Sequence, residues 1–170
     1  KAFLDILSNM HFEKYEMTPS KYVVLIKAYG WAGLIDSAID FLDLMESLGK
    51  KPNEKHYSCV LNATLKENQF QKAQIILDRM KKSGIHPDVV TYTTLIDGSC
   101  KTGQIQVACN FFDDMLRDGI VPNVLTYSAL FNGLCKANEI EKAVSILRDF
   151  TKLELDTVAF NTLMSGLCEN

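Results

Sequence analysis

Small polar side chains recur about every 35 residues at two points of the 170-residue chain. The first series is Ser58, Thr93, Ser128 and, two residues early, Asn161, and the apolar Val23 occupies the same position in the first unit. The second series is Asn53, Asp88, Asn123 and, again two residues early, Asp156. Hydroxyl, amide and carboxylate groups can discriminate one nucleobase edge from another by hydrogen bonding. Helix capping is the alternative, because Asp and Asn are favoured just before helices.

Lysines form a third series with the same spacing, Lys66, Lys101 and Lys136. The five predicted first-helix segments, which contain the lysine series and the first polar series, have a net charge of +3, although the whole chain has a net charge of −3. The total argues weakly against a nucleic-acid binder, but the distribution gives these segments the basic character of a phosphate-binding groove. Lysine is also favoured at a solvated helix C-terminus, which remains an alternative.

The remaining reactive residue types form no catalytic or metal-binding pattern. The chain has five cysteines without a C-x-x-C pair, and Cys100, Cys135 and Cys168 share one repeat position. That spacing suits small packing residues in successive layers and not one ligand sphere. The three histidines fit no motif, and no nucleophile, phosphate-loop or dinucleotide signature is present. We therefore expect no catalysis, metal, cofactor or small-molecule substrate.

The elements that position these series are repeated helical hairpins. Several core-type residues follow the 35-residue period, among them Tyr57, Tyr92 and Tyr127, Ala73 and Ala108, Met80 and Met115, Gly84 and Gly119, and Pro87 and Pro122. Apolar residues at helical spacing predict two helices per unit, closed by Gly and Pro. The predicted units are 19–53, 54–88, 89–123 and 124–156, with a partial second helix at 1–18 and a partial first helix at 157–170.

One hairpin cannot bury its own apolar face, whereas stacked hairpins can. The sequence therefore predicts an all-α, right-handed superhelical solenoid with the first helices on the concave side. No apolar run reaches the roughly 20 residues of a membrane span, so we expect no membrane insertion. Both ends lie inside apparent helices, so we expect a longer parent protein.

The segments 89–101 and 124–136 closely resemble the opening of a plant pentatricopeptide repeat. The closings 84–88 and 119–123 match that repeat too. The uniform units resemble the P subclass, which lacks an appended editing domain. The 34-residue tetratricopeptide repeat has a Trp/Leu/Gly/Tyr pattern that this chain does not show.

This resemblance implies binding of single-stranded RNA, with one base per repeat. In the family a first-turn residue and the last residue of the unit select the base. By that code Ser58 with Asp88 favours guanine and Thr93 with Asn123 favours adenine. Ser128 with Asp156 suggests guanine, Val23 with Asn53 is weakly selective, and Asn161 suggests a pyrimidine. The expected RNA core is 5′-(any)-G-A-G-(pyrimidine)-3′.

The resemblance also assigns the other contacts and a cellular setting. It implies that Val90, Leu125 and Val158 sandwich bases, although burial between helices is the alternative, and that the lysine series contacts phosphates. It implies a role in RNA stabilisation, processing or translation in the mitochondrion or, alternatively, the chloroplast. Two other classes remain open: a structural RNA-binding subunit of a large ribonucleoprotein such as the mitochondrial ribosome, and a solenoid that binds a peptide or partner protein.

Overall fold

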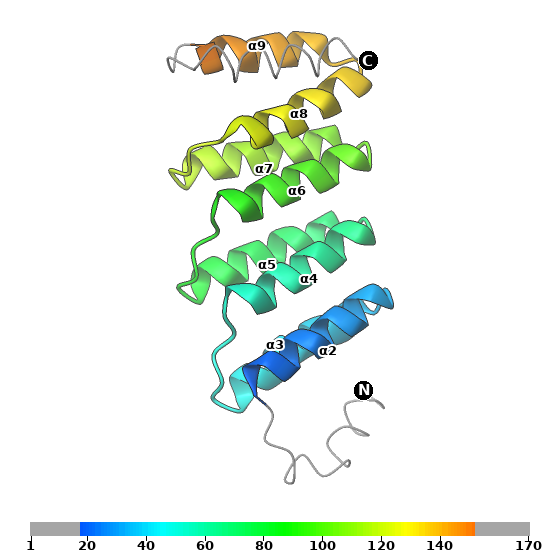
Figure 1. The fold of residues 1–170 in the computed structure, drawn as a ribbon, viewed down its shortest axis with the longest axis vertical. Coiled ribbons are helices and arrows are strands. Elements are labelled where there is room, and N and C mark those ends of the chain that lie inside the picture. Colours follow the sequence, from blue (N-terminus) through cyan, green and yellow to red (C-terminus); the bar gives the residue numbers. More distant parts are fainter. Residues whose placement is uncertain (1–17, 152–170) are drawn as a thin grey trace. The chain divides into compact units, whose positions relative to one another are not determined.

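The protein is built from paired α-helices joined by short turns (Figure 1). The computed structural model describes residues 18–151, and side chains for residues 18–146. In chain order the helices are α2 (Pro19–Trp31), α3 (Ile35–Ser47), α4 (Glu54–Lys66), α5 (Phe70–Lys82), α6 (Val89–Lys101), α7 (Ile105–Arg117), α8 (Val124–Lys136) and α9 (Ile140–Thr151). All the regular structure in this part of the chain is helical, in agreement with the predicted all-α fold.

The chain divides into two compact units, residues 1–63 and 64–170, with the boundary inside α4. In the first unit α2 packs against α3. Its fully buried side chains include Tyr22, Ile26, Phe41, Leu42 and Met45.

In the second unit α6 packs against both α7 and α8, and α8 packs against α7 and α9. The core here includes Tyr92, Leu95, Ile96, Phe111, Met115, Leu130 and Phe131. The hairpin α6–α7 thus shares a core with the hairpin α8–α9, and the first helices of the two hairpins lie side by side.

The hairpins end where the chain adopts a left-handed conformation. Gly119 follows α7 with φ of 75°, and the Ile120 N–H donates to the Met115 carbonyl oxygen at 3.0 Å. This bond closes the helix in a Schellman arrangement. The turn between the two helices of a hairpin also needs a positive φ, which Gly103 supplies at 74° and Asn138 at 58°. Asparagine tolerates this conformation better than most residues, so it can replace glycine there.

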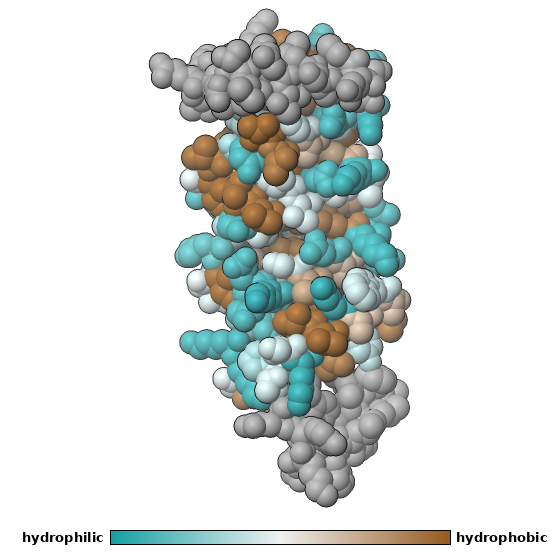
Figure 2. Space-filling view, viewed as in Figure 1, coloured by the Kyte–Doolittle hydropathy of each residue, from teal (hydrophilic) through white to brown (hydrophobic). Residues whose placement is uncertain are grey.

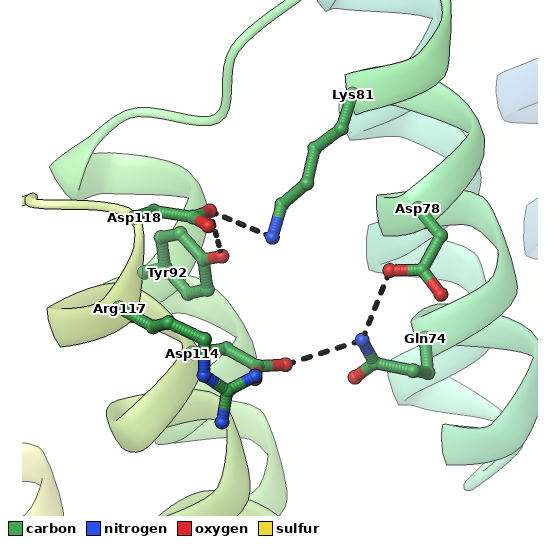
Figure 3. A network of polar contacts seen from close by, with 7 residues as sticks. All are labelled: Gln74, Asp78, Lys81, Tyr92, Asp114, Arg117 and Asp118. Carbon is green, nitrogen blue, oxygen red and sulfur yellow. Dashed lines mark hydrogen bonds and ion pairs between the residues drawn. The ribbon is translucent and has the colours of Figure 1, made fainter.

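A polar network joins α5 to the α6–α7 hairpin (Figure 3). Asp118 Oδ2 accepts from the Lys81 ammonium at 2.7 Å and from the Tyr92 hydroxyl at 2.5 Å. The Gln74 amide donates to Asp114 at 3.2 Å. Burial raises the pKa of Tyr92, and its hydrogen bond to Asp118 raises it further. Burial opposes the charge on Asp118, but the donors Lys81 and Tyr92 outweigh burial and hold its pKa below the usual value.

The described helices are all too short, or too polar, to cross a lipid bilayer.

Candidate nucleic-acid interface

A pocket of about 440 Å³ lies between α6 and α8 and is open to solvent. Its lining residues are Val90, Thr93, Thr94, Asp97, Asn123, Leu125, Ser128, Ala129 and Asn132. The sequence had singled out five of them: the polar residues Thr93, Asn123 and Ser128 and the apolar residues Val90 and Leu125. Stacking of adjacent hairpins therefore brings both predicted kinds of base contact into one pocket.

The apolar pair of this pocket is exposed. Val90 has 65% of its surface accessible and Leu125 has 69%. On the face seen in Figure 2, hydrophobic groups gather at the level of α8 among polar groups. The alternative interpretation, burial between packed helices, is therefore wrong for these two side chains. An exposed aliphatic pair in a pocket can contact both faces of a flat ring.

Asn123 lies at the N-cap of α8 and caps the helix through one atom. Its Oδ1 accepts from the Thr126 main-chain N–H at 2.9 Å and from the Thr126 hydroxyl at 3.0 Å. Two donors on one oxygen fix the orientation of the amide, so the Nδ2 group is the one left for a ligand. Thr93 Oγ1 lies 2.6 Å from Thr126 Oγ1. Thr126 thus connects the two predicted selectors of the unit 89–123.

Asp88 occupies the same position before α6. Its Oδ1 accepts from the Thr91 N–H at 2.8 Å and from the Thr91 hydroxyl at 2.9 Å. The Asp88 side chain is exposed, and its Oδ2 has no donor among the described residues. The capping interpretation is therefore right for both Asp88 and Asn123, yet each keeps one polar atom for another partner.

The pair predicted to select its base weakly, Val23 and Asn53, belongs to the first unit. Val23 is half-buried on α2, and Asn53 is exposed before α4. Instead of a threonine, His56 contacts Asn53: its Nδ1 lies 2.6 Å from the Asn53 side-chain oxygen. Ser58 is half-buried in the first turns of α4. The predicted residues Asp156, Val158, Asn161 and Cys168 lie outside the described residues, as do the partial unit 157–170 and all but the last residue of 1–18.

The lysine series lies at the ends of α4, α6 and α8, and Lys66, Lys101 and Lys136 are all exposed. Lys101 and Lys136 line one small recess of about 90 Å³ together with Asp97. The Lys101 ammonium lies 2.6 Å from Asp97 Oδ2, and this hydrogen bond raises the pKa of Lys101. The Asp97 carboxylate thus offsets part of the positive charge of Lys101. Lys136 has no ion-pair partner in the described part of the chain.

The two described cysteines of the predicted packing series differ in their burial. Cys100 is buried and Cys135 is half-buried. Burial raises the pKa of Cys100 to about 12, so its thiol stays protonated. Over residues 18–146 no three His, Cys, Asp or Glu side chains come together in a group that could hold a metal ion.

Sequence reasoning missed several residues of the interface. Asp97 and Asn132 line the pocket, and they occupy one repeat position that Asn62 also shares. Thr91 and Thr126 contact the closing selectors and are also 35 residues apart. The period could have indicated both positions, but their contacts depend on side-chain geometry that the period does not contain.

The paired helices and the open pocket between adjacent first helices define a helical-repeat protein of the solenoid class. A family model described as PPR repeat family matches residues 52–101 and 87–136, and a PPR repeat model matches 21–49 and 125–154. The chain belongs to the PPR repeat family, so the predicted pentatricopeptide resemblance is confirmed. Assignment to the P subclass stays a prediction. No curated protein matches this sequence.

Solved structures share the fold. The pentatricopeptide repeat protein PPR10 from maize matches 96% of this chain with a TM-score of 0.76 and 24% identity. PPR10 in complex with an 18-nt psaJ RNA element matches 87% of this chain with a TM-score of 0.67 and 26% identity. This chain covers 22% of the PPR10 chain in both structures.

A second protein of this class matches nearly the whole chain. The PPR domain of Arabidopsis thaliana protein-only RNase P 1, in complex with tRNA, has a TM-score of 0.67 and 17% identity. The match covers 96% of this chain and 87% of that domain. These likenesses confirm the predicted helical-repeat solenoid.

Proposed function

We propose that this chain binds single-stranded RNA sequence-specifically, with one base in each inter-repeat pocket. The pocket between α6 and α8 carries the proposal, because it combines an exposed aliphatic pair with two fixed polar groups. Sequence-specific RNA recognition uses splayed bases, which are contacted on their faces and hydrogen-bonded on their edges. Val90 and Leu125 supply the face contacts, and Thr93 and Asn123 supply the edge contacts.

The chemistry of the closing residue accounts for the preferred base. Adenine presents a ring nitrogen that accepts and an amino group that donates, and the Asn123 Nδ2 group can donate to that ring nitrogen. Guanine presents a ring N–H and an amino group that both donate, so it requires an acceptor such as Asp88 Oδ2. The repeats therefore favour guanine at the base read with Asp88 and adenine at the next base.

The structural relatives support this proposal, because PPR10 and the PPR domain of the plant RNase P have both been solved with RNA bound. We further propose that the chain binds without catalysing a reaction, and that the RNA core is 5′-(any)-G-A-G-(pyrimidine)-3′. The family resemblance favours a mitochondrial or chloroplast transcript, stabilised, processed or translated with the help of the bound protein, within a ribonucleoprotein or alone.

Reciprocal exchange of the two closing residues tests the proposal. Asp88→Asn converts an acceptor into a donor, so its base preference should move from guanine toward adenine. Asn123→Asp should move the adjacent preference the other way. Each shift should reach at least about fivefold, since one hydrogen bond to a charged group is replaced. Fluorescence anisotropy at low salt with short RNAs varied at one nucleotide measures the preferences.

The control is Asp113→Asn, which makes the same charge change at an exposed site that has no ion pair within residues 18–146. It should leave both preferences unchanged. RNAs that bind with equal affinity whatever the nucleotide, in the wild-type chain and in both exchanged variants, would refute base selection by these residues.

A further inference from the structure

The last residue of each of the first three units, here called the closing residue, is contacted by the third residue of the next unit. These third residues are His56, Thr91 and Thr126. The Thr91 hydroxyl lies 2.9 Å from Asp88 Oδ1, and the Thr126 hydroxyl lies 3.0 Å from Asn123 Oδ1. These threonines are buried, and Thr126 has no exposed surface at all. They cannot contact a base in the pocket themselves, so any effect on recognition must pass through the closing residue.

The hydrogen bonds around Thr126 have only one consistent direction. The side-chain oxygen of Asn123 only accepts, so Thr126 donates its single proton to it. In the 2.6 Å contact with Thr93, Thr93 must therefore be the donor. The chain of bonds runs from Thr93 through Thr126 to Asn123. It leaves lone pairs on the Thr93 oxygen and the N–H groups on Asn123 Nδ2 for a ligand.

The Thr126 hydroxyl also accepts from the Asn123 main-chain N–H at 3.4 Å, which completes a capping box, but the bond that satisfies each closing side chain comes from the main chain. The main-chain N–H of Thr126 already donates to Asn123 Oδ1 at 2.9 Å, and that of Thr91 to Asp88 Oδ1 at 2.8 Å. The hydroxyl adds a second bond to the same oxygen. That bond keeps the Asn123 amide from turning its oxygen toward the ligand. The two oxygens of Asp88 are chemically equivalent, so there the bond fixes the direction in which the second oxygen points and not the kind of atom presented.

A different residue, His56, contacts Asn53, the closing residue of the first unit. His56 is fully buried, and its Nδ1 lies 2.6 Å from Asn53 Oδ1. Its Nε2 lies 2.9 Å from the Pro19 carbonyl oxygen, which only accepts, so Nε2 carries a proton. Nδ1 accepts from the Asn53 main-chain N–H at 3.1 Å, so the ring does not donate to Asn53 Oδ1 as the threonines donate to their closing residues. The positioning hydroxyl is therefore a feature of Thr91 and Thr126 that His56 does not reproduce.

We propose that Thr91 and Thr126 are positioning residues for base selection. Thr126 fixes which polar atom of Asn123 faces the pocket and also fixes the hydrogen-bonding direction of Thr93, whereas Thr91 fixes the direction of the Asp88 carboxylate. This inference rests on the proposed RNA-binding function. It assigns specificity to residues that never touch the RNA.

The test replaces the hydroxyl by a methyl group of similar size. Thr126→Val should lower the preference for adenine over guanine at the nucleotide read with Asn123 by about fivefold, the effect of one neutral hydrogen bond. The preference at the nucleotide read with Asp88 should not change. Thr91→Val should give the opposite pattern. Thr126→Ser and Thr91→Ser keep the hydroxyl and should retain the wild-type preferences.

Affinities for short RNAs varied at each nucleotide, with thermal midpoints of all variants, distinguish the outcomes. Val variants that keep the wild-type preference would overturn the positioning role while leaving the proposed function intact. So would an equal loss of affinity for all four bases together with a lower midpoint, which indicates a structural role alone. A wild-type chain without any preference would overturn the proposed function and this inference together.

Discussion

Gly133 of α8 packs directly on Cys100 of α6. A Cβ atom at Gly133 would lie 2.7 Å from Cys100 Cβ and 3.1 Å from Ile105 Cδ1, and nearer still to Cys100 Sγ. Real Cβ atoms do not come so close, so the two first helices approach as they do only because residue 133 has no side chain. Gly133 and Cys100 also line the recess that holds Lys101 and Lys136.

Gly133→Ala should therefore destabilise the protein. The alanine gains up to about 1 kcal/mol of helix propensity, but the forced shift of α6 against α8 should cost more, leaving a net loss of about 1–2 kcal/mol in the free energy of unfolding. Urea unfolding measures this difference. Gly98→Ala is the matched control, because its new Cβ would meet mainly the flexible end of Leu65 at 3.0 Å. Equal losses at both sites would contradict the proposed packing constraint.

Much of the fold could be predicted because the 35-residue period repeats core positions. Tyr92, Leu95 and Met115 are buried as their spacing indicated. The sequence also identified Cys100 as a packing residue but not Gly133 as its partner. The distance between two neighbouring helix axes is a tertiary property, and no local pattern states it.

The residues of the candidate site could be predicted to a similar extent, but their contacts could not. Thr93, Asn123, Val90 and Leu125 were singled out from the period and the resemblance, and all four line one pocket. The bond from Thr93 through Thr126 was not foreseen, because it depends on the approach of two side chains from different repeats. The period places residues at equivalent positions, whereas their hydrogen bonds follow from orientation.

The ion pair of Asp118 should make stability depend on pH. Its pKa is lower in the folded protein than in the unfolded chain, because the Lys81 and Tyr92 donors outweigh burial. A lowered folded pKa contributes stability above the unfolded value, about 3.9, and that stability is lost as the pH falls through the folded value. Asp118→Asn should therefore cost about 1 kcal/mol near pH 7, and this cost should shrink as the pH falls below the unfolded value toward the folded one.

Urea unfolding of wild type and Asp118→Asn across this pH range measures the effect. Asp113→Asn removes a carboxylate that has no hydrogen bond or ion pair in the described part of the chain, so it should show no such pH-dependent difference. A constant gap between wild type and Asp118→Asn from acid to neutral pH would contradict the role of the charged pair.

The exposed aliphatic pair should matter for binding and not for folding. Val90→Ala and Leu125→Ala each remove apolar contact with a stacked base, so RNA affinity should fall about three- to tenfold. The thermal midpoint should hardly change, because both side chains are mostly exposed in the free protein. Val121→Ala, 76% exposed in the turn before α8, is the control and should bind as wild type does. A loss of stability without a loss of affinity would indicate that the pair packs within the protein instead.

Lys101 and Lys136, which line the recess at the ends of α6 and α8, should contribute unequally to RNA binding. Lys101 is paired with Asp97 at 2.6 Å, whereas Lys136 has no such partner among the described residues. Lys136→Ala should lower the salt dependence of the affinity by about one unit of slope, equally for all RNA sequences. Lys101→Ala should have a smaller effect, because Asp97 already offsets part of its charge. Asp97→Asn should strengthen binding.

Affinities measured over a range of salt concentrations test this order. Lys82→Ala, at an exposed site at the end of α5, controls for the change in total charge and should leave the slope unchanged. If Lys82→Ala lowered the slope as much as Lys136→Ala, long-range charge alone would account for RNA binding. If only the α6 and α8 lysines act, and Asp97→Asn raises the affinity, the phosphates must run past the ends of these two helices.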